Sequence, residues 1–357
     1  MLFVCDKSFE VQARGLIEKG SVVPVEVQTI TAGKFRRYSH LTLLQHLTIA
    51  SVVFGNIRDT FKIVIGFFQS IGIILQFKPD VLFAKGGFVC LPLGMAAKVL
   101  RVPIVVHDSD TRPGLTNSIL GRWAAAIATG SPLENYRYPL AISRYVGVPI
   151  AAEFTPYSLQ AQQQAKAHLG FDPARPLVVV TGGGLGAVSI NDAVVVSAKK
   201  LLADGVQLYH VTGRQHYDDI KTLAPQSESY KFVPFIYEGM AGVLGAADIV
   251  ISRASATFVQ ELAGLKKAAI LVPSRALSDQ RKNAIVYKEA EAAIVLSDDE
   301  IAKSGVLYTC IHTLLADPEQ MTSLAERLHR YARPHAARDV ARMVIDTAEM
   351  RQQKKRT

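Results

Sequence analysis

A histidine and two carboxylates stand together in the first half of the chain, at His107-Asp108-Ser109-Asp110. They follow the apolar residues PIVV, which predict a buried strand. At the carboxyl end of a strand, an imidazole or a carboxylate can take a proton from a substrate, so His107 and Asp108 are candidate bases. A polar loop in which Asp110 bonds the backbone is the alternative. Because the sequence offers no third ligand, we expect no metal and no cofactor.

The second half of the chain contains a glycine run, Gly182-Gly183-Gly184-Leu185-Gly186, after the strand pattern LVVVT. Without Cβ atoms, the backbone N–H groups of such a loop can approach a phosphate closely, and the following helix adds its positive N-terminus. The spacing is not GxGxxG, and no Lys-Ser/Thr pair follows, so neither a dinucleotide motif nor a P-loop is matched. A phosphate-binding loop and a ligand-free tight turn both remain compatible with the run.

The segment RASAT at residues 253–257 follows another strand pattern, ADIVIS. Ser255 or Thr257 can cap a helix there, which leaves free N–H groups for a ligand. Glu261 would lie inside this helix, where its carboxylate could accept hydrogen bonds from both hydroxyls of a ribose. A position facing solvent is the alternative for Glu261.

A third strand pattern, AAILVP, precedes Ser278-Asp279-Gln280. Asp279 is typical of a helix N-cap or first turn. Gln280 could reach a sugar hydroxyl, although the segment alone is an ordinary helix start.

Short apolar runs alternate with helical stretches along the chain, which predicts an α/β protein with parallel sheets. The glutamine-rich stretch at residues 151–169 is the best boundary, because a fresh strand pattern follows it. We expect one domain over residues 1–149, a second over 150–333, and a helix over 334–357 that packs back toward the first. Two doubly wound domains of this kind face a cleft and bind ligands at the carboxyl ends of their strands. The strands are predicted at residues 2–5, 23–29, 81–84, 104–107, 126–129, 145–148, 177–181, 206–212, 231–234, 248–252, 268–272 and 293–296.

The composition excludes several classes of protein. With 49% hydrophobic and 20% charged residues, the chain is not disordered, and 357 residues suit two domains. Three separate cysteines, Cys5, Cys90 and Cys310, indicate neither a disulfide framework nor a CxxC metal knuckle. The net charge of +9 favours anionic partners such as phosphates, nucleic acid or an acidic membrane. We expect no nucleic-acid partner, because no basic stripe interleaved with aromatic residues is present.

The most apolar window runs from Phe61 to Phe77. Its length of about 17 residues is at the lower limit for a membrane span. Apolar residues occupy nearly every side, which favours a buried helix over a simple amphipathic one. A helix with one apolar side resting on lipid is the alternative, since basic side chains lie upstream or at its start as anchors for acidic headgroups. These are Arg36, Arg37, His40, Arg58 and Lys62.

Taken in order, the motifs resemble those of the MurG family, glycosyltransferases of the GT-B fold that act in peptidoglycan synthesis. The resemblance covers nearly the whole chain and implies two Rossmann-like domains facing a cleft. It implies transfer of N-acetylglucosamine (GlcNAc) from UDP-GlcNAc to undecaprenyl-diphospho-muramoyl-pentapeptide at the cytoplasmic face of the cell membrane. The stretch from Phe61 to Phe77 would then contact the anionic membrane surface. The matching segments are GGFV (86–89), HDSD (107–110), PGLTN (113–117), GVP (147–149), GGGLGA (182–187), FI (235–236), ADIVISRASA (247–256) and DQ (279–280).

The resemblance also implies roles for single residues. Glu261 would hold the ribose, Ile236 would present its backbone to the uracil, and Gln280 would bind the GlcNAc hydroxyls. His107 and Asp108 are the catalytic candidates in this chain, although the family's own candidate base is not among its residues. The residues facing the acceptor would be His107, Asp108, Asp110 and Asn117. The donor-binding residues would be Asp110, Gly184, Asn191, Ile236, Arg253, Ala256, Thr257, Glu261 and Gln280, with Ala256 and Thr257 offering N–H groups to the diphosphate and Arg253 a positive charge.

The sequence departs from the family's pattern at several positions. HEQN reads HDSD, GGSQGA reads GGGLGA, and Ala151 replaces an arginine after the Gly-x-Pro motif. The family also opens with a strand and a GGTGGH loop, whereas Met1 aligns with its second strand. We therefore expect either an N-terminally incomplete chain or a lineage that lost this unit and its catalysis. The alternatives for function are a non-catalytic nucleotide-sugar-binding relative and a GT-B transferase with a different lipid acceptor.

Overall fold

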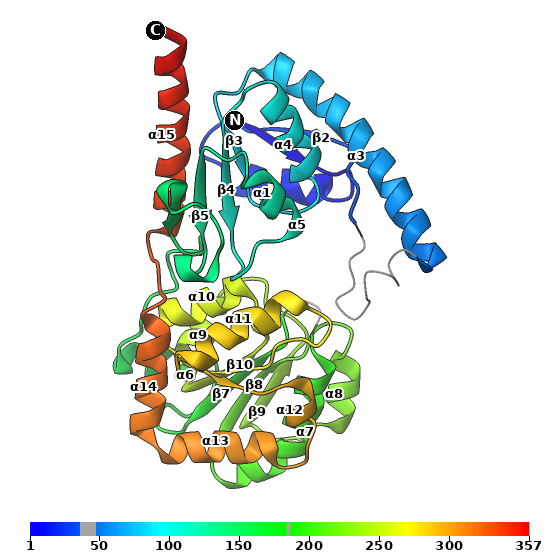
Figure 1. Cartoon of the computed structure of the whole chain (residues 1–357). Coiled ribbons are helices and arrows are strands. Elements are labelled where there is room, and N and C mark those ends of the chain that lie inside the picture. The colour runs from blue at the N-terminus through cyan, green and yellow to red at the C-terminus, as the bar shows by residue number, and fades with distance from the viewer. Residues whose placement is uncertain (36–47, 184–185, 357) are drawn as a thin grey trace. The chain divides into compact units, whose positions relative to one another are not determined.

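The computed structural model describes residues 1–35, 48–183 and 186–356, and the chain divides into two units (Figure 1). Unit 1 comprises Met1–Val146 together with Arg338–Thr357, and unit 2 comprises Gly147–Ala337. Each unit is built from parallel strands connected by helices, so the predicted α/β class is confirmed.

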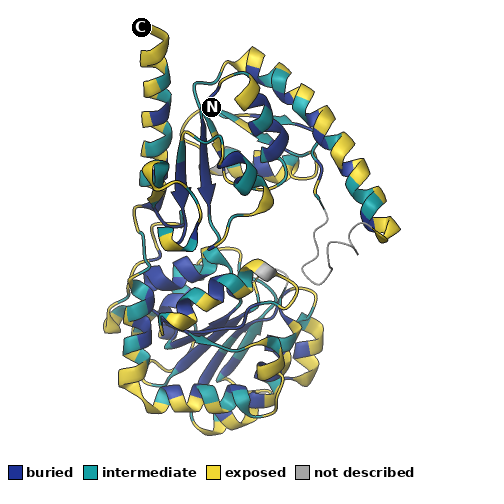
Figure 2. Ribbon diagram, viewed as in Figure 1, coloured by how far each residue is buried: buried dark blue, intermediate teal, exposed yellow. Residues whose placement is uncertain are grey.

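Unit 2 contains a six-stranded parallel sheet in the order β12-β11-β10-β7-β8-β9. Alternate side chains of its central strand, β7 (Leu177–Thr181), enter cores on opposite faces: Val178 and Val180 on one, Leu177 and Val179 on the other. A strand covered on both faces has no polar side, which explains the unbroken run LVVV. Figure 2 shows these strands as the buried centre of unit 2. The other strands are β8 (Gln207–Val211), β9 (Tyr230–Val233), β10 (Ile249–Ser252), β11 (Ala268–Leu271) and β12 (Ile294–Val295).

Helices cover both faces of this sheet. One core contains side chains of α7 (Val188–Ala203) and α13 (Val306–Ala316), and the other contains side chains of α9 (Met240–Ala246) and α10 (Ala256–Leu265). This is the doubly wound arrangement that the alternating sequence pattern predicts. The remaining helices of unit 2 are α6 (Leu159–His168), α8 (Tyr217–Leu223), α11 (Ser278–Glu289), α12 (Asp298–Ile301) and α14 (Pro318–His329).

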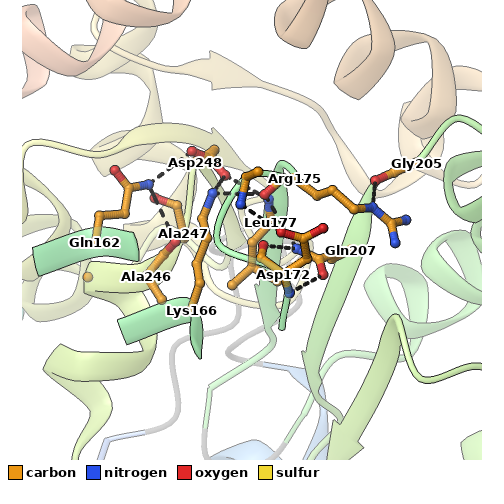
Figure 3. Close-up of polar contacts among 12 residues, drawn as sticks. Gln162, Lys166, Asp172, Arg175, Leu177, Gly205, Gln207, Ala246, Ala247 and Asp248 are labelled. Atoms are coloured by element: carbon orange, nitrogen blue, oxygen red, sulfur yellow. Dashed lines mark hydrogen bonds and ion pairs between the residues drawn. The ribbon is translucent and has the colours of Figure 1, made fainter. Parts of the chain in front are cut away.

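A polar network attaches α6 to the amino ends of β7 and β10 (Figure 3). The Nζ atom of Lys166 lies 2.6 Å from Oδ2 of Asp248, and the same oxygen accepts the N–H of Leu177 at 2.6 Å. Gln162 donates from Nε2 to the carbonyl of Ala247 and to Oδ1 of Asp248, each at 2.9 Å. Asp248 therefore joins one helix and two strands at the amino ends of the strands of this sheet.

Unit 1 contains two parallel sheets. One pairs β1 (Leu2–Cys5) with β2 (Glu26–Thr29), and the other has four strands in the order β3-β4-β5-β6. Within the described residues, no ladder of backbone hydrogen bonds joins the two sheets. The second sheet consists of β3 (Leu82–Ala84), β4 (Ile104–Asp108), β5 (Ala126–Thr129) and β6 (Ser143–Tyr145), and the helices of unit 1 include α1 (Glu10–Gly20), α4 (Cys90–Val99) and α5 (Leu115–Leu120).

The apolar window of the sequence forms the second half of a longer helix, α3 (Ala50–Phe77). One side packs into unit 1 through Ile63, Gly66, Ser70 and Ile74. The opposite side carries exposed apolar residues, so the expectation of a buried helix is wrong for this side (Figure 2). Among the described residues, α3 is the one helix long and apolar enough to cross a membrane. We call the exposed set the α3 apolar stripe: Phe54, Ile57, Phe61, Val64, Ile65, Phe68 and Leu75.

The last helix, α15 (Ala336–Arg356), belongs to unit 1 from Arg338 onward. Val340 packs with Ala128 and Val146 in a small core. Farther along, Nη1 of Arg351 donates to the carbonyl of Pro79 at 2.6 Å. The chain therefore leaves unit 1 after Val146 and returns to it with this helix.

Candidate functional site

The order of strands in unit 2 identifies where a ligand should bind. From β7 the chain proceeds to β8 and β9 on one side, and then crosses to β10, β11 and β12 on the other. Loops that leave the carboxyl ends of β7 and β10 therefore diverge, and open α/β sheets bind ligands in the crevice at such a switch point. Those two loops contain the glycine run and the segment RASAT.

The described glycines of the run have backbone angles or close contacts that a residue with a Cβ atom could not adopt without strain. A Cβ on Gly182 would lie 2.4 Å from the amide nitrogen of Ala187, and Gly183 and Gly186 have φ angles of 82° and 77°. A Cβ on Gly186 would also meet the carbonyl oxygen of Thr212 at 2.4 Å. Gly184, one of the predicted donor-binding residues, lies outside the described residues.

After β10, the helix α10 begins with free backbone donors. Oγ of Ser255 accepts the N–H of Phe258 at 3.4 Å, which makes Ser255 the N-cap. Ala256 and Thr257 occupy the first two helical positions, where N–H groups have no partner within the helix. The side-chain amide of Asn283 fixes the preceding loop by donating to the carbonyl of Ala254 at 3.2 Å. This helix start can bind an anion such as a diphosphate.

Glu261 lies one turn beyond Thr257 on the same face of α10. Its side chain is half-buried, and no hydrogen bond or ion pair is found for it within the part of the chain that the structure describes. Burial, together with the nearby charge of Glu153, raises the pKa of Glu261 to about 7. A carboxylate held in this way lacks the partners that a structural carboxylate has, and a ligand with two hydroxyls would supply them.

Arg253 does not present a free charge. Its Nη1 atom donates to the carbonyl of Val272 at 3.0 Å and lies 2.8 Å from Oδ1 of Asp298, and its Nη2 atom donates to Oγ of Ser189 at 3.2 Å. Asp298 also accepts from Ser189 at 2.5 Å and from the N–H of Arg275 at 2.9 Å. Although burial opposes it, these hydrogen bonds and the Arg253 charge hold the pKa of Asp298 below its ordinary value.

Asp298 is a residue that sequence reasoning missed. It joins the start of α7, the loop after β10 and the loop after β11 through Ser189, Arg253 and Arg275. Its only sequence signal was its place after Ser297, which caps α12. A capping pattern predicts a helix start but not a partner 45 residues away.

Two other predicted donor residues have their polar atoms partly used by the protein. Oε1 of Gln280 accepts the N–H of Ser274 at 2.9 Å, which leaves the Nε2 group and one lone pair of Oε1 for other partners. Asn191 is buried and donates from Nδ2 to the carbonyl of Thr212 at 2.9 Å. Its Oδ1 atom lies 2.9 Å from Nε2 of His210. Asn191 therefore holds the loop after β8 in place through its hydrogen bond to Thr212.

Ile236 is half-buried and follows β9, so its loop lies at the same edge of the sheet as the glycine run. The rings of the residues on either side of it, Phe235 and Tyr237, meet edge to face with centroids 5.0 Å apart. Its predicted contact with a uracil stays a prediction.

In unit 1, the predicted residues His107, Asp108 and Asn117 are all buried, at the end of β4 and in α5. Oδ2 of Asp108 accepts from the hydroxyl of Tyr138 at 2.9 Å, and Nδ2 of Asn117 donates to the carbonyl of His107 at 3.2 Å. Burial and the charge of Asp108 raise the pKa of Tyr138, which keeps that hydroxyl protonated. The backbone carbonyl of Asp110 accepts from Tyr136 at 2.5 Å.

The Oδ1 atom of Asn117 is buried and has no hydrogen-bond partner among the described residues. A Cβ on Gly86 would lie 3.4 Å from it, and both Gly86 and Gly87 have positive φ angles, 94° and 83°. These glycines lie in the loop between β3 and α4. The side-chain amide of Asn117 therefore lies beside the backbone of this loop, where no side chain intervenes. A buried acceptor without a donor is costly unless a ligand or water completes it.

Comparison with known proteins agrees with these observations. The profile of the "Glycosyltransferase family 28 N-terminal domain" matches residues 22–129, and that of the C-terminal domain of the same family matches residues 177–339. A transferase of Lachnospira eligens is 34% identical over 296 residues, which are 82% of this chain and 77% of the relative. A Treponema pallidum relative is 32% identical over 345 residues, 93% of this chain and 84% of the relative. Both are named "UDP-N-acetylglucosamine--N-acetylmuramyl-(pentapeptide) pyrophosphoryl-undecaprenol N-acetylglucosamine transferase".

Among solved structures, Acinetobacter baumannii MurG superposes with a TM-score of 0.71 at 22% identity, covering 96% of this chain and 90% of that one. Two α/β units with parallel sheets, together with the match to both domains of this family, define a hexosyltransferase of the GT-B class. The chain belongs to glycosyltransferase family 28.

Proposed function

We propose that this protein transfers GlcNAc from UDP-GlcNAc to undecaprenyl-diphospho-muramoyl-pentapeptide, a step of peptidoglycan synthesis. The observation that carries the proposal is the first part of α10. Free N–H groups at Ala256 and Thr257 match a diphosphate, and the unpartnered carboxylate of Glu261 matches the diol of a ribose. The 34% identity to a transferase named for this reaction supports the same donor and acceptor.

In this mechanism, unit 2 holds the donor and stabilises the leaving group. As the bond between GlcNAc and the diphosphate breaks, negative charge grows on UDP, and the N-terminus of α10 stabilises that charge. Ile236 would contact the uracil. Gln280 would bind the sugar by donating from Nε2, while its Oε1 atom, held by the N–H of Ser274, keeps the side chain in place.

Unit 1 would hold the acceptor, whose hydroxyl must lose a proton as it attacks the anomeric carbon. His107 and Asp108 stay the proposed catalytic residues of this chain, with Asn117 and Asp110 on the acceptor side. Since His107 and Asp108 are buried, a proton can reach them only from a group that comes into contact with the carboxyl end of β4. The orphan Oδ1 atom of Asn117 would accept a hydrogen bond from the acceptor.

We also propose that the protein binds peripherally to the cytoplasmic face of the cell membrane through the α3 apolar stripe. Arg58 and Lys62 border the stripe, with side-chain exposures of 60% and 42%. Exposed phenylalanines beside basic side chains are typical of helices that lie on anionic lipid. Contact with lipid would bring unit 1 to the surface where a lipid-linked acceptor resides.

Incubation with UDP-GlcNAc and the lipid-linked muramoyl-pentapeptide tests the reaction, with UDP release and glycosylated lipid as readouts. We expect turnover, and Glu261→Ala should reduce kcat/KM at least 10-fold through donor binding. The control is Glu289→Ala, which removes an exposed carboxylate of α11. Donor binding without turnover would support a non-catalytic relative, and turnover on another lipid would support a different acceptor. Unchanged donor affinity in Glu261→Ala would refute the donor assignment.

A further inference from the structure

Arg214 follows β8 in a loop that lies directly against the glycine run. The preceding residue, Gly213, approaches Gly186 so closely that a Cβ on Gly186 would meet the Gly213 Cα at 3.2 Å. The strand that ends in this loop, β8, is the neighbour of β7 on the side away from β10. Arg214 and Arg253 therefore occupy loops on opposite sides of the glycine run.

Two aromatic rings hold the guanidinium of Arg214. Its Cζ atom lies 4.9 Å from the ring centroid of Phe235 and 5.2 Å from that of Tyr237. Its Nη2 atom donates to the hydroxyl of Tyr237 at 2.9 Å. Both rings come from the loop after β9, on either side of Ile236. The side chain thus connects the loop after β8 with the loop predicted to meet the nucleotide base.

The contacts of Arg214 hold its guanidinium in place but do not neutralise its positive charge. Cation–π contacts orient a guanidinium but leave its positive charge and most of its donors available. Among the residues that the structure describes, one of the five N–H groups of Arg214 has a hydrogen-bond partner and no carboxylate pairs with its guanidinium. By contrast, the charge of Arg253 is balanced by Asp298 at 2.8 Å.

We propose that Arg214 is a diphosphate-binding residue of this site. The inference rests on the proposed function and adds a residue that no motif indicated. A guanidinium fork matches phosphate oxygens, and the aromatic support limits the rotamer freedom lost on binding. Two substrates carry the same group: the nucleotide sugar and the lipid-linked acceptor each contain a diphosphate.

The experiment measures binding of UDP and of uridine to the full-length protein by titration calorimetry, and the KM for the acceptor. Arg214→Gln removes the charge, and Arg214→Lys keeps it without the fork. The control, Arg327→Gln, removes an equal charge from α14 in the same unit, where Arg327 pairs with Glu291. Thermal unfolding curves of all three variants check that the fold is retained.

We expect Arg214→Gln to weaken UDP binding about 10- to 100-fold and to leave the affinity for uridine unchanged. Arg214→Lys should recover part of the loss, and Arg327→Gln should resemble the wild type. A raised acceptor KM with unchanged UDP affinity would assign Arg214 to the acceptor's diphosphate instead.

Equal losses for UDP and uridine would overturn the proposal, since they would indicate a contact with base or ribose. Unchanged UDP affinity together with an unchanged acceptor KM would overturn it as well, while leaving the proposed function intact. Failure of the wild-type protein to bind UDP would refute both.

Discussion

Two titratable residues of unit 2, His210 and Glu261, differ in whether the protein itself provides their hydrogen-bond partners. His210 is fully buried, and its ring nitrogens lie 2.9 Å from Asn191 and 3.0 Å from the hydroxyl of Tyr230. Because Oδ1 of Asn191 can only accept, Nε2 of His210 carries the proton and Nδ1 accepts from Tyr230. Glu261 has no comparable partner among the residues that the structure describes. The first residue belongs to the core, whereas the second is the residue that we propose binds the ribose.

At the residue scale, the pKa of Glu261 predicts pH-dependent donor binding. Only the ionised carboxylate can accept from both ribose hydroxyls, so affinity should fall as the pH drops through its pKa of about 7. We expect UDP-GlcNAc to bind about 10-fold more weakly at pH 6 than at pH 8. The nucleotide sugar is the right probe, because its diphosphate has no terminal phosphate that titrates in this range. Glu261→Gln should bind weakly at both pH values.

The same residue should oppose folding at high pH. Its pKa is higher in the folded than in the unfolded chain, so its contribution to stability falls as the pH rises from about 4.5 to 7. Glu261→Gln should therefore increase the free energy of unfolding at pH 8 by about 1 kcal/mol, after allowance for partial exposure. Equal stability of variant and wild type at pH 8 would contradict the raised pKa.

His210 predicts the opposite dependence on pH. Burial lowers its pKa to about 3, below the value of about 6.5 in an unfolded chain. Its contribution to stability is complete above pH 6.5 and is lost as the pH falls toward 3. Between pH 7 and 5, this single residue should reduce the free energy of unfolding by about 2 kcal/mol. Denaturant unfolding of His210→Gln should show a flatter profile, whereas exposed His335→Gln should follow the wild type.

Single residues were predictable from sequence where a local pattern marked them. Ser255 and Glu261 could be placed on α10 because capping and helical spacing are local. The ion pair of Arg253 with Asp298 could not be predicted, since it depends on strand order, which brings residues 45 positions apart together. The support of Arg214 by Phe235 and Tyr237 was hidden for the same reason: β8 and β9 had to be neighbours first.

At the scale of elements, strands were easier to predict than helix ends. The expected strand at 177–181 coincides with β7, because a run of β-branched residues favours a buried strand over a helix. The expected strand at 23–29 shortens to Glu26–Thr29, since Pro24 has no N–H for a ladder. The helix α3 begins at Ala50, well before the apolar window. The window did not include these first turns because they contain polar residues such as Asn56.

The α3 apolar stripe makes a prediction at this scale. The side chains of Phe61 and Phe68 are 67% and 66% exposed, and both face away from unit 1. Replacing both with serine should weaken binding to anionic vesicles by about 2 kcal/mol, roughly 30-fold, in a flotation assay. Leu140→Ser is the control, because Leu140 is 72% exposed but lies outside α3. Equal flotation of the double variant and the wild type would exclude the stripe as the lipid contact.

For the whole molecule, the two units have separate hydrophobic cores and should respond separately to a ligand. UDP at 100 times its dissociation constant should stabilise unit 2 by about 2.7 kcal/mol. In scanning calorimetry, we expect the transition of unit 2 to move upward while that of unit 1 stays in place. Glu261→Gln, if it binds UDP about 10-fold more weakly, should reduce this stabilisation to about 1.4 kcal/mol at the same UDP concentration. A shift of the unit 1 transition alone would indicate that UDP binds to unit 1, and this would contradict the proposed site in unit 2.

The return of α15 to unit 1 has a consequence for synthesis on the ribosome. Unit 2 is continuous in sequence, so it can fold as soon as Ala337 has left the exit tunnel. Unit 1 is made first but lacks the contacts of Val340 and Arg351 until α15 emerges. Because translation runs at about 5–20 residues per second, unit 1 waits while unit 2 is made, and it completes its fold only after unit 2 can fold. A ribosome that stalls before α15 would carry a complete unit 2 attached to an incomplete unit 1.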